Sequence, residues 1–384
     1  MKKPSFTVSS FGRTKYGEKA RKFTLNGAGG VVLEVSDYGG KVVRLFTPDK
    51  RGKLKDVVVG FDSPAGWDSG DPYWGCIIGR YSNRIAKGEF KIGGKKIKLP
   101  ALNNAPGGIG CNLHGGARGW NAYVWKAEPF IDGTDVGVVF SHVSPDGDEG
   151  FPGKVEAKVK YTLTAKNVWR VDYEAVSDAV TPVGMTQHVY FNFKGEAGGT
   201  IEDHVMKIAA GKYLPTDAGQ IPTGKFKDVA GTPFDFRKGM RIGEMINAPD
   251  RDLEIGKGYD HCWVLDPPKS SKSQWREDGR LRYAGDVFCP LNGRGVAVWT
   301  TEPCMQVYTA NWASYDQTAK GGEHLSFRCG VALETQHAPD SPNKPKWPTT
   351  FLRPGETYRS ATEFRFFAKR RQTRPDGRRR SRSS

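Results

Sequence analysis

Two stretches of strict alternation, at 155–163 and 169–175, constrain the fold of this chain more than any other feature. Between Val155 and Leu163 the odd-numbered residues are apolar, and the residues between them are charged or hydroxylated. Successive side chains of a β-strand point to opposite faces, so this pattern predicts a strand with one buried and one solvated face. The second stretch repeats the pattern after a short turn at 165–167. Together they predict an antiparallel hairpin.

Further strand-like runs are spread over the chain, and convincing amphipathic helices are nearly absent. Helical turns are predicted only at 242–248 and 317–320. Strands separated by turns, without intervening helices, predict an all-β sandwich or barrel rather than βαβ units. We find no break in composition before residue 368, so we expect one domain over residues 1–368. The additional predicted strands lie at 31–35, 57–61, 136–143, 296–300 and 305–309.

Positive charge is concentrated at the end of the chain. The formal net charge is +16, and residues 369–384 hold eight basic residues against a single acid, Asp376. This segment has no apolar periodicity, so we expect it to be a disordered tail. Such a tail can bind polyanions weakly through charge alone. No specific nucleic-acid binding is expected, because no base-stacking motif accompanies the charge.

The cysteine pattern and the start of the chain indicate the compartment. The six cysteines are scattered without a Cys-x-x-Cys pair, which argues against a structural zinc site and against a dense disulfide framework. No apolar segment follows the two lysines near Met1, and no run is long enough to span a bilayer. We therefore expect no membrane association and a cytoplasmic location, or a secreted or periplasmic one if a leader ahead of Met1 has been removed.

Glu334 is the most informative single residue for function. It lies in a predicted strand at 331–336, and the strand pattern ends shortly before Pro339. Alternation places Glu334 on the same face as Ala332 and Gln336, opposite an apolar face. A carboxylate between a small residue and an amide is suited to meeting a small polar ligand.

A second predicted strand repeats this arrangement with an imidazole. In the run 187–193, His188 shares a polar and aromatic face with Tyr190 and Asn192, while the other face is apolar. An acid and an imidazole on separate strands suit proton transfer to and from a polyol. We therefore take Glu334 and His188 as the candidate catalytic pair.

The remaining polar candidates each also have a plain structural interpretation. Asn83 and Arg84 precede an apolar residue, and the guanidinium could donate to sugar hydroxyls or form an ion pair. His114 precedes two glycines, which permit close approach of a ligand but also suit a simple turn. Asp260 could accept hydrogen bonds from vicinal hydroxyls or cap a turn. Gln306 lies on a predicted strand and shares a face with an aromatic residue.

Taken together and in order, these segments resemble the aldose 1-epimerase, or galactose mutarotase, family. Each segment alone is a weak signal, whereas the ordered set is highly specific. The resemblance covers about residues 10–367. The segments that carry it are Gly79–Ala86, Leu113–Gly116 followed by Gly119 and Trp120, Asp148–Gly153, Tyr190–Asn192, Tyr259–His261, Gln306–Thr309, Leu333–Gln336 and Leu352–Tyr358.

The resemblance implies both a fold and a site. The expected fold is a large antiparallel β-sandwich with few short helices and a sugar cleft on its concave face. The resemblance implies Glu334 as the catalytic base and His188 as the acid. No cofactor and no metal are expected, and the protein is expected to be a monomer or a homodimer. The residues expected to bind the sugar are Asn83, Arg84, His114, Asp260 and Gln306.

The implied reaction interconverts the α and β anomers of a free hexose such as glucose or galactose. Ring opening removes the proton of the C1 hydroxyl and protonates the ring oxygen, so a carboxylate and an imidazole can supply both transfers. If His188 is protonated while Glu334 is ionised, the rate follows a bell in pH. In that case His188 sets the alkaline limb and Glu334 the acid limb.

Three other functions stay open on the sequence alone. A hexose-6-phosphate 1-epimerase of the same fold would need several arginines around the phosphate. A glycosidase could use Asp260 and Glu334 as its two carboxylates, but it would leave His188 without a task. A non-catalytic carbohydrate-binding protein would not require an acid–base pair. His261 is a rival candidate for the base.

Overall fold

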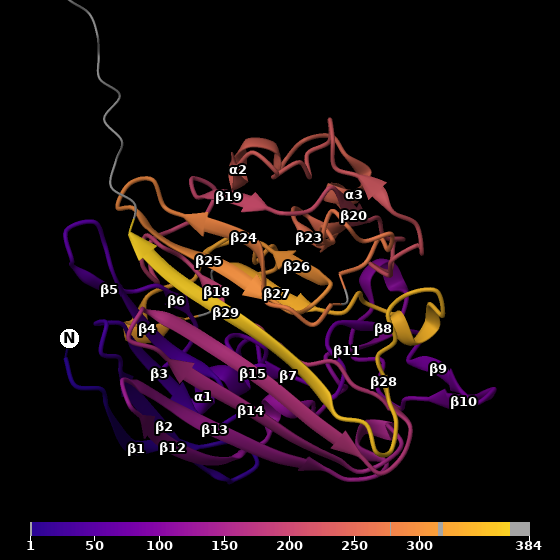
Figure 1. Ribbon diagram of the computed structural model, residues 1–384, viewed down its shortest axis with the longest axis horizontal. Helices are drawn as coiled ribbons and strands as arrows, with labels where there is room; N and C mark the ends of the chain where they lie inside the picture. Colours follow the sequence, from indigo (N-terminus) through magenta and orange to yellow (C-terminus); the bar gives the residue numbers. More distant parts are fainter. Residues whose placement is uncertain (1, 277, 314–317, 369–384) are drawn as a thin grey trace, which may run out of the picture.

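A computed structural model describes residues 2–276, 278–313 and 318–368 (Figure 1). Their strands form three larger antiparallel sheets of five, nine and seven strands, together with four two-stranded pairs. The helices among these residues are short. This architecture confirms the predicted all-β class and the large antiparallel β-sandwich. The basic tail predicted at 369–384 lies outside the described residues, as does the first residue of the helical turn predicted at 317–320.

The nine-stranded sheet contains the predicted hairpin. The two alternating stretches form β14 and β15, which pair antiparallel with Leu163 opposite Trp169. Figure 1 shows these strands running beside the long strand β29. In sheet order the strands are β12 (Lys126–Asp132), β13 (Asp135–Ser144), β14 (Val155–Leu163), β15 (Val168–Ser177), β29 (Tyr358–Ala368), β25 (Arg294–Thr300), β24 (Arg282–Phe288), β19 (Val205–Ile208) and β22 (Met240–Arg241).

The seven-stranded sheet holds the strands that were expected to carry the site. Strand β27 lies near its middle, between β26 and β18, and Glu334 is directly opposite Gln306. The run predicted as a strand at 57–61 contributes only two residues here. In sheet order the strands are β21 (Lys227–Asp228), β20 (Lys212–Leu214), β23 (Asp260–Val264), β26 (Cys304–Tyr308), β27 (Val331–Gln336), β18 (Tyr190–Phe191) and β6 (Val58–Val59).

The third sheet is formed by the N-terminal strands β1 (Ser5–Arg13), β2 (Lys19–Asn26), β3 (Val32–Ser36), β4 (Val42–Pro48) and β5 (Leu54–Asp56). The two-stranded pairs are β7 (Ile77–Ile78) with β17 (Thr186–Gln187), β8 (Arg84–Ala86) with β11 (Cys111–Leu113), β9 (Glu89–Ile92) with β10 (Lys95–Lys98), and β16 (Thr181–Pro182) with β28 (Phe351–Leu352).

The helices of the described residues are α1 (Pro64–Ser69), α2 (Ile242–Met245) and α3 (Arg251–Gly256). Helix α2 confirms the helical turn predicted at 242–248. Near the turn predicted at 317–320 the structure has a 3₁₀ turn, Lys320–Gly322. Helix α3 was not predicted. The side chain of Asp250 caps it by accepting a hydrogen bond from the Asp252 N–H. The helix has only six residues, which is too short for a helical periodicity to be recognised in the sequence.

One large hydrophobic core joins the three sheets. Phe191 of β18 packs against Phe364 of β29 with ring centroids 5.6 Å apart, which joins the seven-stranded sheet to the nine-stranded sheet. Phe23 of β2 packs edge-on against Phe140 of β13 and joins the five-stranded sheet to the nine-stranded one. Leu333 of β27 is buried in the same core. Because side chains alternate, Glu334 must therefore point away from this core.

Candidate active site

A cavity of about 390 Å³ lies over the polar face of the seven-stranded sheet. Six of the seven predicted site residues line it, which brings together segments from Asn83 to Glu334. The seventh, Gln306, lies just behind the wall, where its Nε2 donates to Asp260 Oδ1 at 2.6 Å. The structure thus assembles the predicted residues into one site, with Gln306 supporting Asp260.

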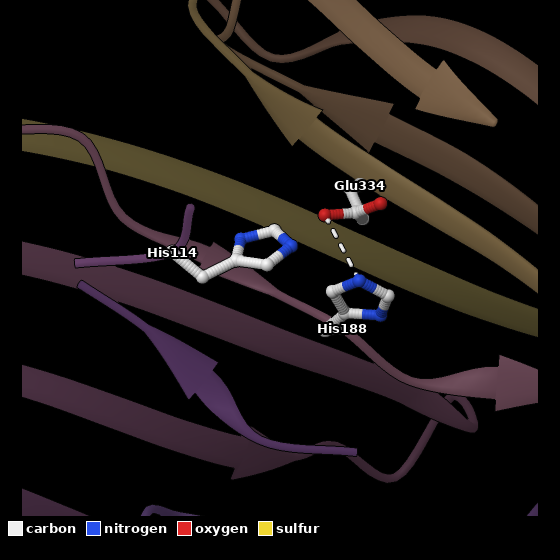
Figure 2. A group of neighbouring side chains, drawn as sticks. All are labelled: His114, His188 and Glu334. Atoms are coloured by element: carbon white, nitrogen blue, oxygen red, sulfur yellow. Dashed lines mark ion pairs between the residues drawn. The ribbon is translucent and has the colours of Figure 1, made fainter. Parts of the chain in front are cut away.

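Glu334 and His188 face each other inside this cavity (Figure 2). His188 Nε2 lies 3.5 Å from Glu334 Oε2, and both side chains are at least 95% buried. His188 is held by its backbone, because its N–H donates to Cys76 O and its carbonyl accepts from the Gly75 N–H. Its ring stacks on Tyr190 at 5.0 Å between centroids. The two groups are therefore pre-positioned within reach of one small ligand.

The pKa values of this pair differ from the order expected from the sequence. Burial raises the pKa of Glu334 well above its usual range, and the negative charge of Asp260 raises it further, while Arg84 partly opposes both. Burial lowers the pKa of His188 to about 4. These shifts favour the last proton of the pair on the carboxyl group rather than on the imidazole. Between the lowered pKa of His188 and the raised pKa of Glu334 the pair holds one proton, which is the state that acid–base catalysis requires.

His114 is oriented as a hydrogen-bond donor into the cavity. The Asn83 backbone N–H donates to His114 Nδ1 at 3.1 Å. Burial and the neighbouring His188 lower the pKa of His114 well below its usual range, so the ring is neutral. A neutral ring that accepts at Nδ1 carries its hydrogen on Nε2. Figure 2 shows the His114 ring directed toward the other two side chains.

The first of the two glycines after His114 is required by close backbone contact. A Cβ on Gly115 would lie 2.2 Å from Gly79 O, and Gly115 has a φ of +89°. His114 itself has a φ of +53°, an uncommon value for a residue other than glycine. This packing places the imidazole at the cavity wall, so the His-Gly-Gly segment meets a structural requirement of the fold.

His114, His188 and Glu334 also have the composition of a metal site, since their ligand atoms lie within 4.8 Å of one another. Two histidines and a glutamate are a common zinc-binding set. However, the Asn83 N–H occupies His114 Nδ1, so a neutral His114 keeps its hydrogen on the nitrogen that would have to bind the metal. The hydrogen bonding of this cluster therefore fits proton transfer better than metal binding.

Arg84 and Asp260 form another polar part of the cavity wall. Arg84 Nη2 lies 3.5 Å from Asp260 Oδ2, and both side chains are 9% exposed. Arg84 also donates from Nε to Asn104 Oδ1 at 3.1 Å and from Nη2 to Gln220 Oε1. His261, the rival base, faces away from the cavity and packs against Phe234 in the core at 4.8 Å between centroids.

Several cavity residues were missed by the sequence analysis. Asn104 and Gln220 lie in irregular loops, where no periodicity marks a side chain as buried. Trp312 was also missed, although an exposed tryptophan beside Tyr308 is a signal for a sugar-stacking surface. Asp71 follows a short helix in a turn segment, and burial raises the pKa of its carboxyl to about 6.

The fold and the site define a β-sandwich with a buried carboxylate–imidazole pair in a small polar cleft. A profile described as aldose 1-epimerase matches residues 21–365. The chain is 38% identical over 363 residues to galactose mutarotase of Rattus norvegicus, covering 94% of this chain and 98% of that protein. It is 36% identical over 354 residues to aldose 1-epimerase of Escherichia coli, covering 92% and 96% respectively.

A solved structure agrees with these relatives. Galactose 1-epimerase from Lactobacillus acidophilus NCFM superposes with a TM-score of 0.78 at 25% identity, covering 94% of this chain and 98% of that one. The chain belongs to the aldose 1-epimerase family, and it is an enzyme of the isomerase class. None of the helices in the described part of the chain has the length and apolar character that a membrane span requires.

Proposed function

We propose that Glu334 and His188 carry the aldose 1-epimerase reaction of this protein, the interconversion of the α and β anomers of a free, neutral hexose such as glucose or galactose. The observation that carries the proposal is the buried pair at 3.5 Å in a cavity lined with groups that bind hydroxyls. The names of the relatives, galactose mutarotase and aldose 1-epimerase, support the same reaction.

The reaction needs two proton transfers at adjacent atoms of the sugar. Glu334, as a carboxylate, takes the proton from the C1 hydroxyl while protonated His188 donates a proton to the ring oxygen. The bond between C1 and the ring oxygen breaks, C1 becomes an aldehyde, and rotation about C1–C2 exposes either face to ring closure. The reverse transfers then restore both groups. Because burial favours the proton on Glu334, the reactive form requires the proton to move to His188 across the 3.5 Å contact.

The other site residues bind hydroxyl groups in this proposal. His114 donates from Nε2, and Asp260, held by Gln306 and Arg84, accepts from sugar hydroxyls. The backbone N–H of Asn83 holds the His114 ring, and the Asn83 side chain also lines the cavity. A cavity of this size suits a single hexose.

The charge of the cavity disfavours a phosphorylated substrate. Among the described residues that line it, Arg84 is the one arginine and no lysine is present, while Asp71, Asp260 and Glu334 contribute carboxyl groups. Even with Glu334 protonated, Asp71 and Asp260 outnumber the single guanidinium, so a dianionic phosphate would meet net repulsion. This supports a neutral hexose over the hexose-6-phosphate alternative.

Polarimetry tests the proposal directly. Freshly dissolved α-D-glucose and α-D-galactose should reach their equilibrium rotation faster with the protein than in buffer alone. The Glu334→Gln protein is the matched control, because it keeps the shape of the side chain and loses the base. Equal rates with and without the wild-type protein would show that neither sugar is a substrate.

We also propose a cytoplasmic location. All six cysteines are buried free thiols, which supports folding in a reducing compartment. Cell fractionation followed by immunodetection should find the protein with cytosolic markers, and recovery from the culture medium would contradict this.

A further inference from the structure

The guanidinium of Arg84 is held on two of its three nitrogens. Nε donates to Asn104 Oδ1 at 3.1 Å, while Nη2 donates to Gln220 Oε1 and lies 3.5 Å from Asp260 Oδ2. Two acceptors for the two hydrogens of Nη2 satisfy that nitrogen completely. Among the described residues Nη1 has no hydrogen-bond partner, and it is not one of the fully buried unsatisfied atoms.

Asn104, Gln220 and Asp260 together form a clamp around the guanidinium, and this clamp limits what Arg84 can bind. An arginine grips a carboxylate or a phosphate through two parallel hydrogen bonds, from either the Nε and Nη2 edge or the Nη1 and Nη2 edge. Both edges include Nη2, which is already occupied in this cavity. Arg84 can therefore offer single hydrogen bonds from Nη1, which suit a neutral hydroxyl oxygen, but it cannot form a two-point grip on an oxyanion.

Gln220 is the central part of the clamp, and its position is strongly determined. The residue is 4% exposed, and its φ of +57° is unusual for a residue other than glycine. The turn around it is held by Asp217 Oδ1, which accepts from the N–H groups of Gly219 and Ile221 at 2.9 and 3.1 Å. A backbone held in this way keeps Oε1 directed at Arg84 without help from the ligand.

We propose that Gln220 is a specificity-determining positioning residue, which holds Arg84 for neutral sugars and prevents it from gripping oxyanions. The inference rests on the proposed function, because it concerns the sugar cleft of the same site. Gln220 lines the cavity, and in this inference it acts through Arg84, to which its Oε1 is bonded.

The test compares Gln220→Leu with two control variants. In Gln220→Leu we expect the KM for glucose to rise about tenfold with kcat nearly unchanged, the effect of losing one hydrogen bond to a charged group. Freeing Nη2 should also allow inorganic phosphate to bind, so its inhibition constant against glucose should fall about tenfold. Gln220→Glu keeps an acceptor oxygen facing Arg84, so it should restore the KM and the weak phosphate inhibition of the wild type.

The second control distinguishes the specific effect of Gln220 on Nη2 from the general effect of removing any polar side chain from the cavity wall. Asn104→Leu frees Nε but leaves Nη2 occupied, so it should raise the KM without improving phosphate inhibition. If Gln220→Leu fails to fold, Gln220→Met provides the same removal of the acceptor with a flexible side chain.

Two results would overturn the inference. One is an unchanged KM in Gln220→Leu, and the other is a raised KM with phosphate inhibition as weak as in Asn104→Leu. Calorimetric titration of phosphate into each variant gives the same answer without turnover. A wild-type protein that does not accelerate glucose mutarotation would instead contradict the proposed function, while the phosphate titrations would still report on the clamp.

Discussion

Two pairs of glutamate and histidine, each with a buried glutamate, involve residues in or next to strand β27 but differ in their chemistry. Glu334 of β27 faces His188 at 3.5 Å in the cavity. Glu302 pairs with His337, just beyond the end of the same strand, at 2.7 Å. Both carboxyl side chains are almost fully buried, at 2% and 3% exposed. Burial alone therefore cannot explain why only one pair is suited to catalysis.

The difference lies in the hydrogen bonds and neighbouring charges that each carboxylate has within the protein. For Glu302, burial would raise the pKa, but the charge and hydrogen bond of His337, with further bonds from Ser360 and Tyr358, outweigh burial and lower the pKa below its usual range. For Glu334, one oxygen has no hydrogen-bond partner among the described residues, and the neighbouring Asp260 repels its negative charge. A satisfied pair stabilises the fold, whereas an unsatisfied one has groups left for a substrate.

The largest expected effect is a loss of activity on replacing Glu334, which the replacement of Glu302 should not cause. Replacing Glu334 by Gln should lower kcat by about 10²- to 10⁴-fold, the contribution of one positioned acid or base. The free energy of unfolding should hardly change, because burial favours the neutral form of this carboxyl group, which the amide of Gln resembles in charge and shape. Initial polarimetric rates and thermal denaturation measure the two quantities. Near-normal rates in a folded Glu334→Gln protein would remove this residue from the mechanism.

His188 is the next test, and its signature is in the pH profile. The wild type should follow a bell. Its rate falls as pH drops through about 4, because His188 then becomes protonated while Glu334 is still protonated and no base is left. Its rate also falls at high pH, where the pair loses its last proton at the raised pKa of Glu334.

His188→Asn should lower the rate by about 10²-fold or more and leave one ascending limb, set by ionisation of Glu334. Rates across the pH range, corrected for buffer catalysis, measure this. A bell that survives unchanged in His188→Asn would mean that another group is the acid.

Asp260 links sugar binding to the state of Glu334. Asp260→Asn should raise the KM about tenfold, because a charged hydrogen-bond acceptor for the sugar is lost. Removing the negative charge should also lower the pKa of Glu334, so the alkaline limb should move to lower pH. The pH dependence of kcat, measured at saturating sugar, isolates this shift. An alkaline limb that stays in place would show that Asp260 does not influence the base.

The smallest effect on activity is expected from the second pair. Glu302→Gln should leave kcat within about twofold of wild type, and lower the free energy of unfolding by about 2 kcal/mol at neutral pH through the loss of charged hydrogen bonds. Because the pKa of Glu302 is lowered in the folded protein, its contribution is present above its ordinary pKa and lost as pH falls through the lowered value. Denaturant titrations of both proteins at several pH values should therefore converge at low pH.

The two arginines of one motif show where sequence reasoning reaches its limit. Arg80 and Arg84 lie four residues apart in the same segment. Arg80 is buried beneath the loop at 144–153, where it donates to Ser144, Pro145, Pro152 and Gly153. Arg84 points into the cleft. Both residues are arginines in one short motif, so the sequence does not show which of them anchors a loop and which lines the cavity. Only their contacts in the folded protein distinguish them.

The all-β class, the hairpin at 155–175 and the face of β27 that carries Glu334 could all be predicted from the order of the amino acids. These follow from a period of two residues, which is a local property of the chain. The tertiary structure alone decided that His261 faces the core, that Gln220 clamps Arg84 from 136 residues away, and that Glu334 rather than His188 holds the last proton of the pair. Hydrogen-bond partners and desolvation depend on distances between segments that are remote in sequence, and no local pattern encodes those distances.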